Sequence, residues 1–215
     1  MNNAEWQARA ATWELLALSF RYPGPELAGA VASGEWAEAA EELAAALGLE
    51  VGGGCEEGRL EYSGSDLLRA LRPEATRLFV GAPEPACSPY EGVWRAADDG
   101  VQALLFVNPH SMEVERFMRG CGLGRPEGTN EPLDHVATEC ELLEHLALRA
   151  AGAEPPEGAP AGADLPGGSP EAAYGAFLEE HARAWMPRFA GAVAAESRAP
   201  FYRDAAAFLG ALVAQ

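Results

Sequence analysis

Apolar residues recur along most of the chain at intervals of three or four positions, the period of an α-helix. Residues 6–20 carry one such stripe, which predicts a helix that ends before Pro23 and Gly24. The same spacing predicts further helices, at 34–48, within 65–81 as two short helices broken at Pro73, at 93–108, 111–124 and 131–148, and two or three between 169 and 215.

Three stretches lack this period. Residues 50–64 are rich in glycine, 82–92 hold three prolines, and 151–170 are mostly Pro, Gly, Ala and acid. Strand patterns are nearly absent. The predicted fold is therefore all-α, a single helical-bundle domain of about eight to ten helices. Residues 1–150 form its main part, 151–170 a linker or loop, and 171–215 the last helices, which complete the domain or exchange with a second chain in a dimer.

The composition favours a soluble protein in a reducing, cytoplasmic setting. Fifteen basic and 33 acidic residues give a net charge of −18, which repels nucleic acid and anionic lipid and attracts cationic partners. The four cysteines form no C-x-x-C pair, which argues against a zinc site or disulfide framework. No apolar run reaches the length of a membrane span, and the N-terminal segment is not expected to be a secretory signal peptide.

The segment EPLDH at 131–135 opens the helix 131–148 with a polar cluster. Pro132 suits the first helical position, so Glu131 is expected as N-cap and Asp134 in the first turn. An apolar face follows and is expected to pack inward, at Leu133, Val136, Ala137, Cys140, Leu143 and Ala147. Asp134 and His135 are not needed for that face.

This cluster allows several interpretations. Asp134 could simply cap the helix. A helical metalloprotein or enzyme would use His135, Glu139 and His145, with Cys140 as a further ligand. His135 with Glu139 and Glu141 with His145 stand four residues apart, but the two pairs point in different directions, and no di-iron Glu-x-x-His repeat is present. A catalytic reading would need Ser88 or Cys87 as nucleophile. No nucleotide or hydrolase motif occurs, so catalysis is not expected.

Five segments in order resemble the TorD/DmsD/NarJ family of molybdoenzyme maturation chaperones. They are RLFVG at 77–81, SPYEGVW at 88–94, SMEVERFMRGCGL at 111–123, EPLDH at 131–135, and FLEEHARAWMPRF at 177–189 with PFYRDAAAFL at 200–209. The resemblance spans roughly residues 10–212. Gly92 departs from it, since serine is usual there, and Cys140 stands where a larger aliphatic residue is common.

The resemblance implies a non-catalytic chaperone without a cofactor. It would bind the twin-arginine signal peptide of a molybdenum-cofactor oxidoreductase precursor and hold the precursor in the cytoplasm until cofactor insertion and folding are complete. Carried over by motif, the signal-peptide site comprises Glu131, Asp134, His135, Tyr90, Trp94, Leu78 and Phe79. His181 and Trp185 match the last motif, with a role left open.

Physical chemistry fits this implied function. A twin-arginine peptide has a cationic end and an apolar segment, so its receptor needs carboxylates beside an apolar groove, and Asp134 and Glu131 could pair with guanidinium groups. Core packing is the competing role for Leu78 and Phe79, and core and groove are both open for Tyr90 and Trp94. The protein is expected as a monomer or a domain-swapped homodimer.

Overall fold

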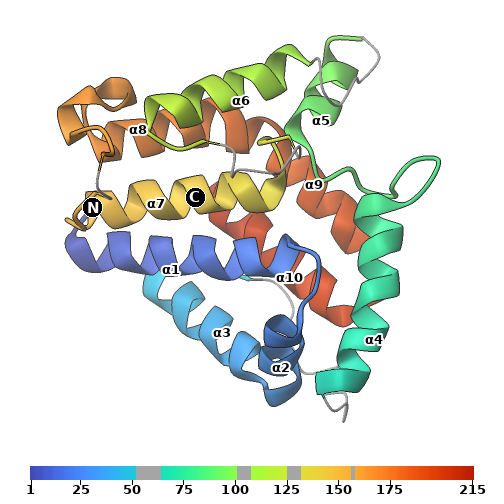
Figure 1. The fold of residues 1–215 in the computed structure, drawn as a ribbon. Coiled ribbons are helices and arrows are strands. Elements are labelled where there is room, and N and C mark those ends of the chain that lie inside the picture. The colour runs from blue at the N-terminus through green and yellow to red at the C-terminus, as the bar shows by residue number, and fades with distance from the viewer. Residues whose placement is uncertain (52–63, 101–107, 125–131, 156–157) are drawn as a thin grey trace. The chain divides into compact units, whose positions relative to one another are not determined.

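The computed structural model describes residues 1–51, 64–100, 108–124, 132–155 and 158–215 (Figure 1). The described residues are mostly helical and include no β-strand beyond one isolated bridge between Tyr90 and His135. The predicted all-α fold is confirmed. No helix in these ranges is both long and apolar enough to cross a membrane.

The α-helices are α1 (Asn3–Phe20), α2 (Pro25–Ser33), α3 (Glu35–Leu47), α4 (Gly64–Ala75), α5 (Glu91–Asp98), α6 (Pro109–Gly120), α7 (Val136–Ala150), α8 (Pro170–Phe177), α9 (Arg183–Glu196) and α10 (Pro200–Ala214). Two π-helical turns, η2 (Thr76–Val80) and η5 (Leu178–Ala182), continue α4 and α8. Two short 3₁₀ turns, η3 (Gly162–Asp164) and η4 (Pro166–Gly168), precede α8.

The chain divides into two compact units. Unit 1 comprises Met1–Glu14 and Tyr90–Trp185, and unit 2 comprises Leu15–Pro89 and Met186–Gln215. The boundaries fall inside α1 and α9, so each unit is assembled from two separate stretches of sequence. The division expected from the sequence, with a linker or loop at 151–170 between a main part and the last helices, stays a prediction.

Unit 1 has a core built on the apolar face of α7, which packs against α8 (Figure 1). The predicted inward face is confirmed, because Val136, Cys140 and Leu143 have no exposed surface. The first part of α1 contributes Trp13, whose indole N–H donates to the Tyr174 hydroxyl at 2.9 Å. Both side chains are large and mostly apolar, and this bond gives their polar atoms a partner inside the core.

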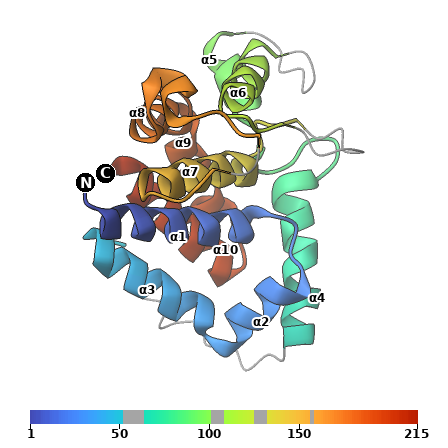
Figure 2. The same ribbon diagram turned by 60° about the vertical axis from the view of Figure 1, so that its left-hand side comes forward.

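Unit 2 has an aromatic core, with α2 packed against α3 and α4 (Figure 1 and Figure 2). Phe79 from η2 meets Phe189 and Tyr202 with ring centroids 6.0 and 5.4 Å apart. Its neighbour Leu78 has no exposed surface. Leu78 and Phe79, predicted to line a groove, thus occupy the core of unit 2.

A bidentate ion pair fastens η2 within the same unit. Arg77 donates to Glu74 from Nε at 3.0 Å and from a terminal nitrogen at 2.9 Å, and to the Glu196 carbonyl at 2.6 Å. Glu74 also accepts from the Arg198 amide at 2.7 Å. The hydrogen bonds from Arg77 outweigh burial and lower the pKa of Glu74, so this carboxylate stays charged and joins α4 to the connection between α9 and α10.

Some predicted boundaries were wrong. No helix was predicted between Gly24 and residue 34, yet α2 begins at Pro25, because proline suits a first helical position and Leu27 is buried. The break predicted at Pro73 does not occur, since α4 continues to Ala75. Burial of Leu71 and Ala75 on either side offsets the one backbone hydrogen bond that proline removes.

The segment predicted as a helix over 93–108 is shorter than expected. Helix α5 ends at Asp98, two residues before Gly100, whose φ of 67° is a conformation open to glycine. Residues 101–107 lie outside the described residues. Within residues 158–170 the chain forms η3 and η4, buries Leu165 and accepts a hydrogen bond from Arg149 at the Pro160 carbonyl.

We expect Phe79→Ala to lower the free energy of unfolding by about 3–5 kcal/mol, because it leaves a cavity among aromatic rings. Val80→Ala is the matched control. Its side chain is 63% exposed, against 8% for Phe79, and its effect should stay within about 0.5 kcal/mol. Chemical denaturation measures both. Similar small losses for the two variants would show that Phe79 is not a core residue.

Candidate functional site

The segment 132–135 forms a turn that ends in the N-cap of α7. His135 has extended backbone angles, and its Nδ1 accepts from the Ala137 amide at 3.1 Å. Helix α7 therefore begins at Val136, four residues later than Pro132. The prediction that Pro132 opens the helix and that Asp134 lies in its first turn was wrong, because the Asp134 side chain turns inward and His135 caps the helix instead. Glu131 lies outside the described residues.

Two of the sequence motifs meet at this turn. Tyr90 and His135 form the isolated β-bridge, and the Glu91 amide donates to the Asp134 carbonyl at 3.0 Å. The rings of Tyr90 and His135 lie edge to face with centroids 5.3 Å apart. Both side chains are half-buried, as is Trp94 on α5. The structure thus brings together the predicted site residues Tyr90, Asp134 and His135 within unit 1.

Asp134 is buried rather than exposed. Its side chain is 1% exposed, and Oδ2 accepts from the Gly92 amide at 2.9 Å and from the Ser111 hydroxyl at 2.6 Å. Burial raises the pKa of Asp134, against the opposing effect of these two bonds. The expectation that this carboxylate lies free for a peptide was wrong, since it was based on a helix position that Asp134 does not occupy.

Asn108 completes this polar cluster. Its side-chain amide donates to the Gly92 carbonyl at 2.6 Å, and its oxygen accepts from the His110 amide at 2.9 Å. Asn108 is therefore the N-cap of α6. The Ser111 hydroxyl, in the first turn of that helix, is turned toward Asp134.

Gly92 leaves no room for a side chain. A Cβ atom there would lie 2.6 Å from the Ser111 hydroxyl, 2.9 Å from Asp134 Oδ2 and 3.0 Å from Asn108 Cγ. The hydroxyl of Ser111 thus occupies the space beside Asp134 that a serine at position 92 would need. The serine that is usual here in the family the sequence resembles would therefore not fit without a shift of these neighbours.

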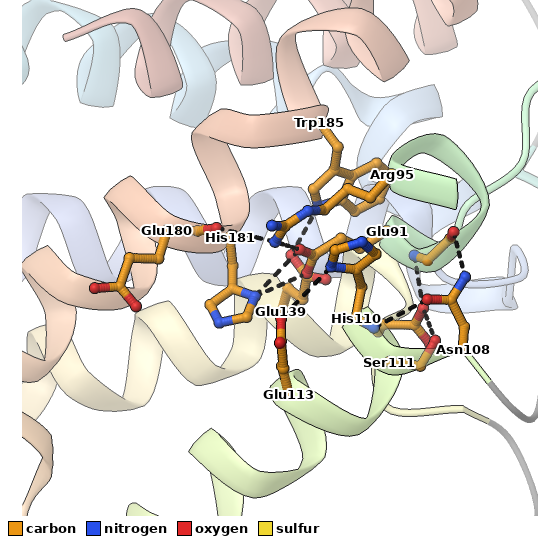
Figure 3. Close-up of polar contacts among 12 residues, drawn as sticks. Glu91, Arg95, Asn108, His110, Ser111, Glu113, Glu139, Glu180, His181 and Trp185 are labelled. Carbon is orange, nitrogen blue, oxygen red and sulfur yellow. Dashed lines mark hydrogen bonds and ion pairs between the residues drawn. The ribbon is translucent and has the colours of Figure 1, made fainter. Parts of the chain in front are cut away.

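A second polar cluster surrounds Glu91 (Figure 3). The Glu91 carboxylate has no exposed surface and accepts from Arg95 at 2.7 Å. His181 Nδ1 lies 3.1 Å from each of its two oxygens. Arg95 also donates to the Glu180 carbonyl in the π-helical turn η5 at 3.1 Å. Because an unpaired buried carboxylate is costly, these contacts fix α5 against η5.

Glu139 lies beside Glu91, and its surroundings favour the neutral form of its carboxyl group. It has no exposed surface, and the Trp185 indole N–H donates to its Oε2 at 3.0 Å. Burial, followed by the charge of Glu91, raises the pKa of Glu139 well above its usual range. The carboxyl proton can then donate to the Glu91 carboxylate, so that two buried acids share one negative charge.

Sequence reasoning missed most of this second cluster. Glu91 and Arg95 received no role, Glu139 had a place only in the alternative metalloprotein or enzyme hypothesis, and the part played by His181 and Trp185 was left open. Their motifs were visible in SPYEGVW and FLEEHARAWMPRF, but residues about ninety positions apart cannot be paired from periodicity. Helical spacing placed Glu139 beyond the apolar face of α7, so its burial was not predicted.

A cleft opens beside His181 in unit 1. It has a volume of about 670 Å³ and is lined from four elements, by Arg95, Glu113, Arg116, Phe117, Pro166, Glu180 and His181. Figure 3 shows that Glu113 and Glu180 come from different sides of this region. A volume in this range accommodates side chains of a peptide or a small ligand.

The metal and catalytic readings gain no support from the geometry. Across the described ranges no three His, Cys, Asp or Glu side chains are grouped as metal ligands. His135 caps α7, Glu139 binds Trp185, and burial followed by the Arg149 charge lowers the pKa of His145. Burial raises the pKa of Cys87 to about 11, which is the opposite of an activated thiolate.

Comparison with known proteins gives the family. A family model described as nitrate reductase delta subunit matches residues 31–191. The chain belongs to the nitrate reductase delta subunit family. This is a family of redox enzyme maturation chaperones of the NarJ/TorD type, so the resemblance drawn from the sequence is confirmed.

A solved structure shares the fold of this family member. It is a candidate redox enzyme maturation protein from Archaeoglobus fulgidus, with a TM-score of 0.56 and 20% sequence identity over 96% of this chain and 94% of that chain. A search of curated proteins gave no match. The family match covers all the polar residues of the two clusters, from Glu91 to Trp185.

We expect Gly92→Ala to destabilise the protein by about 1–3 kcal/mol through overpacking. In a Ser111→Gly background the same change should cost less, because the nearest obstructing atom is gone. Gly175→Ala is the control, since a Cβ there meets nothing within 4 Å. Unfolding by denaturant gives all four values. An equal cost of Gly92→Ala in both backgrounds would show that Ser111 does not fill this space.

We expect the stability of Glu139→Gln to depend differently on pH from that of the wild type. The folded protein keeps a proton on Glu139 that the unfolded chain releases above the ordinary glutamate pKa, so stability falls as pH rises, by up to about 1.4 kcal/mol per pH unit. Glutamine can donate to Glu91 and accept from Trp185 at every pH. Unfolding free energies at pH 5 to 8 should therefore diverge in favour of the variant, and parallel profiles would contradict a neutral Glu139.

Proposed function

We propose that this protein is a cytoplasmic chaperone that binds the twin-arginine signal peptide of a molybdenum-cofactor oxidoreductase precursor. It holds the precursor until cofactor insertion and folding are complete. The observation that carries the proposal is the family match over residues 31–191, which includes each motif of the proposed site. The chaperone acts by binding, without catalysis and without a cofactor of its own.

The charge of the chain supports a cationic ligand. A net charge of −18 attracts a peptide with an arginine pair and accelerates its encounter with the protein. Guanidinium groups bind carboxylates through paired, charge-assisted hydrogen bonds. The apolar part of a signal peptide needs aromatic or aliphatic surface close to that point.

The contact surface in this proposal is the half-buried layer formed by Tyr90, Trp94 and His135 in unit 1. These side chains are reachable without unfolding, and the buried clusters behind them fix their positions. In this proposal Asp134 does not touch the peptide. Its buried carboxylate holds the backbone at Gly92 in place through a hydrogen bond. Glu131 remains a proposed contact on the sequence motif alone.

Leu78 and Phe79 have a different place in the proposal. Both belong to the core of unit 2, where Leu78 is fully buried and Phe79 nearly so. They support the motif segment RLFVG by packing, and direct contact with a peptide would require their exposure.

The test is titration of the protein with a synthetic peptide that carries an R-R motif followed by an apolar segment. We expect saturable binding, and Tyr90→Ala should raise the Kd at least about tenfold, equivalent to roughly 1.4 kcal/mol. Tyr22→Ala, at an exposed tyrosine of unit 2, is the matched control and should bind like the wild type.

The outcomes separate the function from the site. A wild-type protein that does not bind the R-R peptide would contradict the proposed function. Binding that is equally strong in the Tyr90 and Tyr22 variants would keep the function and remove Tyr90 from the site.

A further inference from the structure

We propose that the cleft beside His181 receives an arginine side chain of the bound peptide. The inference rests on the proposed function and gives the motif FLEEHARAW a direct role in binding. The cleft lies wholly within unit 1, between α5, α6, η4 and η5, and its volume of about 670 Å³ exceeds that of one side chain. An extended arginine and its neighbouring backbone therefore fit.

His181 presents a ring nitrogen to the cleft from a fixed position. The residue is only 5% exposed, yet it lines the cleft. Its Nδ1 faces both oxygens of Glu91 at 3.1 Å, so Nδ1 carries the proton and donates it to the carboxylate. In the neutral ring Nε2 is then an acceptor, and Figure 3 shows it on the side away from Glu91. Nε2 makes no hydrogen bond to the rest of the described chain.

Two carboxylates complete the acceptor set for a guanidinium group. Glu180 on η5 is exposed and makes no side-chain ion pair within the described ranges. Glu113 on α6 has only a 3.5 Å contact with His110 Nδ1. Because they belong to different elements, the two side chains can approach a guanidinium from separate directions.

Phe117 offers a flat surface for the same group. Its ring is held against Phe177 at 5.1 Å and His181 at 6.0 Å between centroids, and it lines the cleft. A guanidinium stacked on an aromatic face gains cation–π attraction as well as apolar contact. Arginine therefore suits this cleft better than lysine.

The charge around the cleft favours a cation over an anion. Arg95 is already matched by Glu91 at 2.7 Å and by the Glu180 carbonyl. Arg116 is exposed, so water screens its charge. With Arg95 neutralised by Glu91, the lining carboxylates of Glu113 and Glu180 face one remaining guanidinium of the lining, that of Arg116, and the whole chain carries −18.

The test compares two peptides on the full-length protein. One carries the R-R motif and an apolar segment, and the other has citrulline, an uncharged isostere, in place of both arginines. Glu180→Gln should raise the Kd for the R-R peptide by roughly 3- to 10-fold, the range expected for a partly desolvated ion pair, and should leave the citrulline peptide unaffected. Glu154→Gln is the control, since Glu154 is exposed and does not line the cleft.

Each outcome is decisive. Selective weakening in the Glu180 variant supports the cleft as an arginine site. Equal affinity of the Glu180 and Glu154 variants for the R-R peptide would overturn it. Weaker binding in Arg116→Gln, with tighter binding in Glu180→Gln, would also overturn it by showing an anion site. A wild type that does not bind the R-R peptide contradicts the proposed function itself.

Discussion

The fully buried carboxylate of Glu91 is the constraint on which unit 1 depends. It cannot stay in the interior without partners, and it finds them in Arg95 on its own helix and in His181 on η5. Removing one partner from such a buried charge costs about 3–5 kcal/mol. Burial and the charge of Glu91 raise the pKa of Glu139 and so favour its neutral form beside that carboxylate. One charge thus fixes α5, α7 and η5 relative to one another.

This arrangement separates the residues that order the site from those that can touch a ligand. Asp134, Glu91 and Glu139 lie inside, where they bind backbone amides and other side chains. Tyr90 and His135 are half-buried and lie in contact where two chain segments meet. A chaperone of the nitrate reductase delta subunit family needs a surface that is ready before its client arrives, since pre-ordered side chains lose less entropy on binding.

Helical period predicted much of the fold, because burial of α7 follows it at Val136, Cys140 and Leu143. It failed where a polar contact set the geometry. Asp134 lies before the first turn of α7, where its carboxylate accepts a hydrogen bond from the Gly92 amide, and His135 is the N-cap of the helix. Helical spacing placed Glu139 beyond the apolar face, and its burial depends on contacts with Trp185 and Glu91, which are distant in sequence. The motifs indicated which segments mattered, and only the tertiary contacts showed what each residue does.

Hydrogen exchange measured by mass spectrometry, with and without an R-R signal peptide, tests the central claim most directly, because it reports order at each segment of the chain. The account predicts slower amide exchange on binding over α5 and residues 132–139, where the two motifs meet in unit 1. Saturable peptide binding with unchanged exchange in these segments, or with protection confined to unit 2, would contradict it.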